Sequence, residues 1–203
     1  MVTAFTTPLQ RRGYTASLAM TLLRLALAVP LVAFAVVRGP GRLVAIILCV
    51  GFVSDVYDGV VARRYGVATA GLRRLDSAVD TVFYLAAAGC AWRLHADAIV
   101  ANRWLMGVVL GTLILNHVVE TIKFGREASY HAWSAKAWGA ALFVALVVLF
   151  AGDTPALLPG ALWFGILNHF ENLAITLALP SMRHDVPTLF HALAIRRSAQ
   201  SPQ

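Results

Sequence analysis

The sequence predicts an all-α integral membrane protein with about six transmembrane helices. Its 203 residues are 59% hydrophobic and only 13% charged, whereas a soluble domain is roughly 45–50% apolar and 25% charged. Apolar runs of about 20 residues, the length that crosses a bilayer, recur along the whole chain. A soluble core of this size cannot bury so much apolar surface, so we expect a single membrane domain over residues 1–203.

Glycine and proline delimit the expected spans, because most helix faces are apolar and periodicity cannot separate them. Gly39-Pro40-Gly41 breaks the chain after the first span, and Gly66 follows the second. Further glycines and prolines mark the fifth connection, and Pro180 ends the sixth span. The expected spans are 17–38, 42–63, 75–96, 103–124, 135–152 and 156–179.

The first span is expected to be retained and not cleaved as a signal peptide. No convincing small-residue cleavage site follows the apolar run Leu18–Val37, and two arginines precede it. Pro8 and Gly13 are expected to interrupt the preceding segment. Residues 1–16 are therefore predicted to form an N-terminal cytoplasmic segment.

Arginine and lysine set the expected orientation of the chain. They gather at the N-terminus, after the second and fourth spans and in the tail 180–203, and are sparse in the alternate connections. Cytoplasmic segments of membrane proteins are rich in these residues. We therefore expect both termini in the cytoplasm, with the protein in the bacterial inner membrane. The same rule explains the net charge of +7 better than binding of nucleic acid does.

Four aspartates lie where the second and third spans meet, although the chain holds only ten acidic residues. Asp55 and Asp58 are three positions apart at the end of one helix, and Asp76 and Asp80 are four apart at the start of the next, so each pair shares a helical face. The short linker makes the two helices antiparallel neighbours, so the acidic faces can meet. Burying converging carboxylates costs several kcal/mol, a cost that a divalent cation removes. Oxygen ligands without cysteine or histidine favour Mg²⁺ or Mn²⁺.

Spacing alone leaves a second interpretation open, in which these are solvated loop acids that pair with the linker arginines Arg63, Arg64, Arg73 and Arg74. The residues between the acids favour the metal site. Asp55-x-x-Asp58-Gly59-x-x-Ala62-Arg63, followed by Asp76-x-x-x-Asp80, resembles the signature of the CDP-alcohol phosphotransferases, and seven of its eight fixed residues match in register. Thr21-x-x-Arg24 in the first span resembles the family more loosely.

The resemblance implies an activity and roles for the acids. Family members transfer a phosphatidyl or related group from a CDP-linked donor, here expected to be CDP-diacylglycerol, to an alcohol, and they release CMP, as in phospholipid biosynthesis. The resemblance implies two Mg²⁺ or Mn²⁺ ions held by Asp55, Asp58, Asp76 and Asp80. Asp80 is also the expected base that takes the proton of the acceptor hydroxyl. A homodimer is implied as well.

The resemblance also implies where the donor binds. The small residues admit the cytidine ring and the arginine holds a phosphate, which gives the expected donor-binding residues Asp55, Gly59, Ala62, Arg63 and Gly71. Structural roles remain open for two of them, as a helix-packing glycine and as an arginine at the membrane surface. Leu72 stands where the signature has its second glycine. Either this leucine crowds the cytidine, or a small shift lets Gly71 serve.

The alcohol acceptor is not identified by the sequence. Arg73, Arg126 and Lys136 lie on the predicted cytoplasmic side and would suit a phosphorylated alcohol, although contact with lipid headgroups explains them equally well. Polar residues in the fourth and sixth spans either line the acceptor cavity or form hydrogen bonds between helices or across a dimer. They are Asn116, His117, Glu120, Asn168, His169, Glu171 and Asn172.

Two other functions compete with the enzymatic one. A small cation transporter would use the acids to bind its ion, but transporter sites usually lie near the bilayer midplane. The four aspartates are instead expected at the cytoplasmic ends of the second and third spans, where we place the active site. A catalytically silent relative that binds a CDP-lipid is the second alternative, and Leu72 is its main support.

Overall fold

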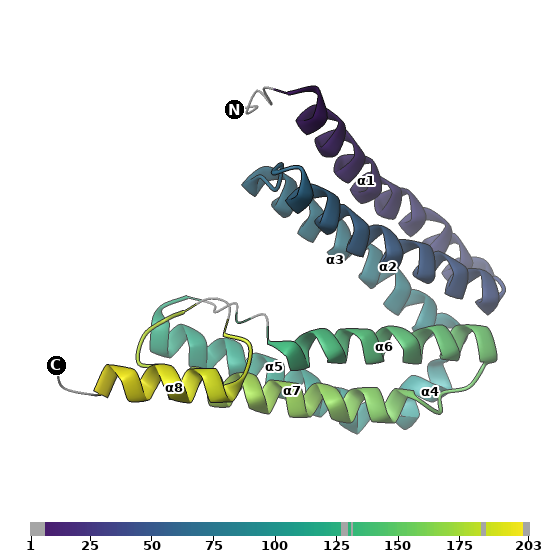
Figure 1. Cartoon of the computed structure of the whole chain (residues 1–203). Helices are drawn as coiled ribbons and strands as arrows, with labels where there is room; N and C mark the ends of the chain where they lie inside the picture. The colour runs from purple at the N-terminus through teal and green to yellow at the C-terminus, as the bar shows by residue number, and fades with distance from the viewer. Residues whose placement is uncertain (1–6, 127–129, 131, 184–185, 201–203) are drawn as a thin grey trace. The chain divides into compact units, whose positions relative to one another are not determined.

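The computed structural model describes residues 7–126, 130, 132–183 and 186–200, and every regular element in these residues is a helix. The prediction of an all-α chain is confirmed for this part of the protein. The helices, labelled in Figure 1, are α1 (Pro8–Val37), α2 (Gly41–Arg64), α3 (Ala70–Leu94), α4 (Ala96–Ala101), α5 (Arg103–Phe124), α6 (Trp133–Gly152), α7 (Leu158–Ala178) and α8 (Leu189–Gln200).

Each expected span corresponds to one long helix, namely α1, α2, α3, α5, α6 or α7. Within the described residues, α1, α2, α5 and α6 are long and apolar enough to cross a membrane. Helix α3 carries four charged residues in its first three turns, and α7 carries the polar run 168–172 at its centre. The four apolar helices indicate an integral membrane protein, and the count of six spans stays a prediction.

The first helix begins earlier than expected, and the prediction that Pro8 and Gly13 interrupt it is wrong. The Thr7 hydroxyl accepts a hydrogen bond from the Gln10 N–H at 3.2 Å, and the Gln10 side chain accepts one from the Thr7 N–H at 3.4 Å. This capping box starts the helix, and Pro8 occupies the first turn, where its missing N–H costs nothing. Gly13 lies against Tyr65, where an added Cβ would come within 2.5 Å of the side chain.

The linker between α2 and α3 is short because both helix ends are well defined. Gly66 adopts a φ of +65°, a left-handed conformation that glycine tolerates. The Val67 N–H then donates back to the Ala62 carbonyl at 2.9 Å. Thr69 caps α3 by accepting the Leu72 N–H at 3.2 Å. Helix α3 therefore starts at Ala70 and not at the expected residue 75.

The described residues group into two compact units. The first contains residues up to Ile99 together with Phe150–Asp153, and the second contains Val100–Leu149 and Thr154–Gln203. In the first unit α1 packs against both α2 and α3, whereas α2 and α3 contact each other much less. In the second unit α5 and α8 both pack against α7. The interpretation of residues 1–203 as one domain stays a prediction.

Candidate active site

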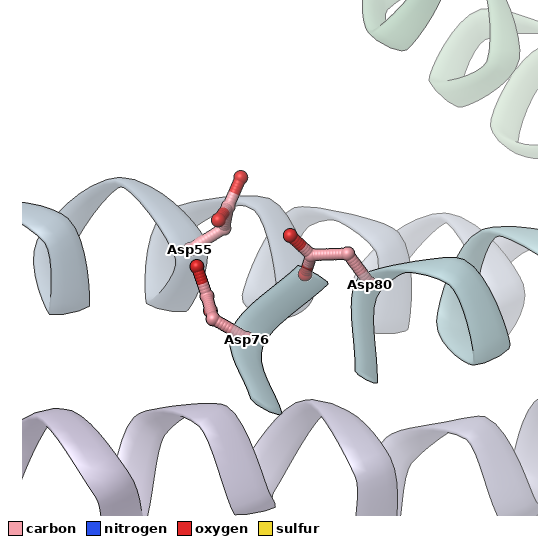
Figure 2. Close-up of side chains that lie close together, drawn as sticks. All are labelled: Asp55, Asp76 and Asp80. Atoms are coloured by element: carbon pink, nitrogen blue, oxygen red, sulfur yellow. The ribbon is translucent and has the colours of Figure 1, made fainter. Parts of the chain in front are cut away.

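The four aspartates at the ends of α2 and α3 converge. Asp55 and Asp58 come from α2, and Asp76 and Asp80 from α3. Figure 2 shows the carboxylates of Asp55, Asp76 and Asp80 turned toward one another, and one oxygen of each lies within 4.8 Å of the others. In the described structure the ion pairs of all four acids are made with Arg24 of α1 and not with the linker arginines.

Arg24 joins the two acidic helices through its two terminal nitrogens. Its Nη1 contacts Asp55 Oδ1 at 2.9 Å and also contacts Asp80 Oδ1. Its Nη2 contacts Asp58 Oδ2 and Asp76 Oδ1. Each nitrogen therefore bridges one acid of α2 and one acid of α3. The acidic faces meet as expected, but they meet around a side chain of α1.

A polar stripe on α1 supports this arrangement from the buried side. Ser17, Thr21 and Arg24 are all buried, and their spacing of four and three residues places them on one helical face. The Ser17 hydroxyl donates to the Asp58 carbonyl at 3.3 Å, and the Thr21 hydroxyl donates to Asp58 Oδ2 at 3.4 Å. The Asp58 side chain is only 4% exposed, whereas that of Asp55 is 32% exposed. Asp58 thus forms the buried floor of the cluster.

The donor set of this cluster fits a divalent cation. The three oxygens of Asp55, Asp76 and Asp80 are hard ligands close enough to share one ion, as Mg²⁺ and Mn²⁺ prefer. Four carboxylates and one guanidinium leave a formal charge of −3, so the cluster still favours added positive charge. Asp58 contributes to this charge, and its role as a direct ligand stays a prediction.

A cavity of about 250 Å³ lies beside the aspartates. Residues from α1, α2, the linker and α3 line it, namely Ser17, Thr21, Asp58, Gly59, Ala62, Arg63, Ala68, Leu72, Arg73 and Asp76. Asp58 and Asp76 belong to this lining, while Asp55 and Asp80 do not. The cluster therefore has one pair of acids toward the cavity and one pair outside it.

Three of the predicted donor-binding residues, Gly59, Ala62 and Arg63, line this cavity. A Cβ added at Gly59 would meet only the Arg63 side chain, at 3.3 Å from Nη1, so this glycine faces the cavity and is not required for helix packing. Gly71 is exposed and is not part of the lining. Leu72 occupies the wall instead, where it packs with Ala62 and Val67.

The three predicted acceptor residues divide between the two units. Arg73 lines the cavity in the first unit. Arg126 and Lys136 belong to the second unit. The Arg126 Nε donates to Met182 Sδ at 2.6 Å, and the Lys136 ammonium lies 4.8 Å from the centre of the Trp133 ring. Their acceptor role stays a prediction.

The polar residues of α5 and α7 form hydrogen bonds between helices in the second unit. The Asn116 amide donates across to the His169 carbonyl of α7 at 3.0 Å, and within α5 to the Thr112 carbonyl at 2.9 Å. His169 Nδ1 and the Thr112 hydroxyl are 2.8 Å apart, and the Ser134 hydroxyl donates to Asn168 Oδ1 at 2.9 Å. These contacts favour the interpretation of a structural seam.

Sequence reasoning did not assign a role in the site to Ser17 or Arg24. The available signal was a single arginine in the apolar run Leu18–Val37, with Ser17 and Thr21 on the same helical face. A charged side chain within a membrane span needs a partner of opposite charge. The four clustered aspartates were the obvious acidic partners for this arginine. Ala68 was also missed, because its place in the cavity depends on how the linker turns.

Comparison with known families agrees with this geometry. Residues 14–184 match the family described as CDP-alcohol phosphatidyltransferase, a range that includes the polar stripe of α1, all four aspartates and most of the second unit. No curated protein and no solved structure matches the chain. Because the match extends over most of the 203 residues, the chain belongs to the CDP-alcohol phosphatidyltransferase family.

Proposed function

We propose that this protein transfers a phosphatidyl-type group from a CDP-linked lipid, CDP-diacylglycerol, to the hydroxyl of an alcohol, and releases CMP. Membership of the family implies phosphatidyl transfer from a CDP-alcohol, a reaction that is generally metal-dependent. The observation that carries the proposal is the convergence of four carboxylates around Arg24, beside a cavity that two of them line. Phospholipid biosynthesis is the role that such a reaction serves.

The cavity next to the aspartates suits the nucleotide end of the donor. Gly59 and Ala62 leave space along α2, and Arg63 offers a guanidinium to a phosphate. Leu72 narrows the same wall, and the volume of about 250 Å³ is below the roughly 300–1,000 Å³ of most ligand pockets. We therefore propose that the cavity holds the single pyrimidine ring of the donor in a tight fit.

Asp55, Asp76 and Asp80 would hold Mg²⁺ or Mn²⁺, with Asp58 as the fourth ligand, and two ions is the number we propose. A divalent ion bound there supplies positive charge to the pyrophosphate of the donor and to the leaving CMP. The carboxylates are already gathered by Arg24, so little rearrangement of α2 and α3 is needed for binding.

Asp80 is the proposed base. The acceptor oxygen forms a bond to the phosphorus of the phosphatidyl group while the bond from that phosphorus to the CMP oxygen breaks. The proton of the acceptor hydroxyl passes to the Asp80 carboxylate, and the leaving electron pair stays on CMP. Asp80 suits this task because it belongs to the cluster but lies outside the lining of the cavity.

The remaining parts of the proposal concern the acceptor and the setting. Arg73, Arg126 and Lys136 support a phosphorylated alcohol, because guanidinium and ammonium groups bind phosphate. We place both termini and the active site on the cytoplasmic side of a bacterial inner membrane, following the distribution of basic residues. A homodimer is the expected assembly.

The test is CMP release by the purified protein in detergent with CDP-diacylglycerol, run over a panel of free and phosphorylated alcohols. We expect release that requires Mg²⁺ or Mn²⁺ and depends on one alcohol of the panel. Metal-dependent binding of the donor without turnover for any alcohol would establish a silent relative. Transport of a labelled cation without CMP release would establish a transporter. Either result would overturn the proposal.

A further inference from the structure

Arg24 combines deep burial with an unusual number of acidic contacts. Its side chain is 1% exposed and is among the largest fully buried side chains of the described residues. It contacts a carboxylate oxygen of all four aspartates. An arginine within a membrane span is expensive without partners, so its position is determined by these acids.

The carboxylates that Arg24 contacts are also the ones that a metal ion would use. Asp55, Asp76 and Asp80 form the triad with oxygens within 4.8 Å of one another, and Arg24 contacts one carboxylate oxygen in each of them. A guanidinium and a divalent cation are both positive, so they repel each other when they bind the same three carboxylates. The ion therefore binds more weakly unless the guanidinium withdraws or turns.

The guanidinium is held in a way that permits such a movement. Its contacts are made through Nη1 and Nη2, while its Nε has no hydrogen-bond partner within the described chain. No bond at Nε fixes the inner part of the group. Because α2 and α3 contact each other far less than each contacts α1, the two pairs of acids also depend on this bridge to stay together.

We propose that Arg24 is a built-in counter-ion, which holds the four carboxylates together before a divalent ion binds and competes with that ion for them. It is a positioning residue, because it acts through the aspartates. The inference rests on the metal role in the proposed function. Without Arg24 the cluster changes from a formal charge of −3 to −4, so the metal-free protein loses stability while attraction for a cation increases.

The experiment compares Arg24→Gln, Arg24→Lys and the wild type in detergent. Mn²⁺ affinity is measured by electron paramagnetic resonance of free Mn²⁺, and melting temperature is measured in EDTA and in saturating Mn²⁺. For Arg24→Gln we expect Mn²⁺ to bind at least about tenfold more tightly. We also expect its melting temperature to fall by at least about 4 °C in EDTA and to recover with Mn²⁺. Arg24→Lys keeps the charge, so its Mn²⁺ affinity should stay near that of the wild type, although a single ammonium cannot make both bridges and its melting temperature in EDTA should fall between those of the wild type and Arg24→Gln.

A matched control is Arg93→Gln, which removes a guanidinium from α3 that donates to the Ala35 carbonyl and touches no acid of the cluster. It should change neither the Mn²⁺ affinity nor the difference in melting temperature between EDTA and Mn²⁺. The inference would be overturned if Arg24→Gln bound Mn²⁺ no more tightly than the wild type does. It would also be overturned if Arg24→Gln melted at the same temperature in EDTA as in Mn²⁺.

A second variant covers the case in which Arg24→Gln does not fold. Combining it with Asp55→Asn returns the cluster to a formal charge of −3, so the double variant should fold in EDTA. If the double variant also stays unfolded, then the loss of folding in Arg24→Gln is caused by lost packing and not by unbalanced charge. That result would overturn the inference. None of these measurements uses a CDP donor, so failure of the proposed reaction and failure of this inference are separate results.

Discussion

The two units of this protein bury polar side chains in different ways. In the first unit four acids gather around Arg24 and leave a net negative charge. In the second unit a single acid, Glu120, is among the buried polar residues that the structure describes, and neutral groups pair between helices, as Asn116 does with the His169 carbonyl and Ser134 does with Asn168. Paired neutral groups join helices and leave little attraction for a ligand. Charge that is gathered and only partly neutralised favours binding of a cation, so we expect the chemistry in the first unit.

The largest effect is expected for Asp80→Asn, because it removes the proposed base. CMP release should fall by about 10²–10⁴-fold, while the affinity for the CDP donor falls far less, because the other aspartates still hold the metal. Asp97→Asn is the control, since Asp97 is an exposed acid in the first turn of α4. Turnover close to the wild-type rate would remove Asp80 as the base.

A smaller loss is expected for Asp58→Asn. Asp58 is buried and contacts Arg24 and Thr21, so the change removes one negative charge from the floor of the cluster. Mn²⁺ affinity and CMP release should fall together by about 10- to 100-fold. Titrating CMP release with Mn²⁺ measures both quantities. An unaltered metal requirement would argue against a ligand role for this residue.

Gly59→Ala tests whether the donor binds along the cavity wall of the first unit. The added methyl group would enter the cavity beside Arg63 without a clash against another helix, so folding should be retained. The KM for the CDP donor should rise by about tenfold. Gly71→Ala is the matched control, because a Cβ there meets no atom within 4 Å. Equal KM values for the two variants would show that the donor does not bind along this wall.

The smallest catalytic effect is expected in the second unit, for Asn116→Leu. This change removes two hydrogen bonds between or within α5 and α7 and should destabilise the protein by about 0.6–1.7 kcal/mol, measured as a lower melting temperature. CMP release below the melting transition should stay near the wild-type value. If CMP release were lost while the melting temperature stayed unchanged, the hydrogen bonds of Asn116 would serve the reaction and not only stability. The contrast between the two units would then be wrong.

Much of the fold could be predicted because membrane helices are long and apolar. The expected span 103–124 coincides with α5, and the expected span 42–63 differs from α2 by one residue at each end. The start of α1 could not be predicted from glycine and proline alone. Its position depends on the capping box at Thr7 and on the contact of Gly13 with Tyr65, and this second contact joins residues far apart in the sequence.

The acids of the site could be predicted, but the way in which they are held together could not. Local spacing fixes which face of α2 carries Asp55 and Asp58, because that is a property of one helix. The place of Arg24 depends on the packing of α1 against both other helices, which periodicity cannot reveal in a helix that is apolar on nearly every side. The sequence also left open whether Leu72 or Gly71 lies at the wall of the cavity. Leu72 does, because Thr69 sets where α3 begins.

Only two of the four aspartates line the cavity, and this has a consequence for the direction from which the alcohol attacks the phosphorus. Asp58 and Asp76 line the cavity, whereas Asp55 and Asp80 are not part of its lining. In a phosphoryl transfer the entering and departing oxygens stand roughly in line, on opposite sides of the phosphorus. If the nucleotide occupies the cavity and Asp80 is the base, as proposed, CMP would depart on the side of Asp58 and the alcohol would enter from the opposite side, which predicts inversion at phosphorus.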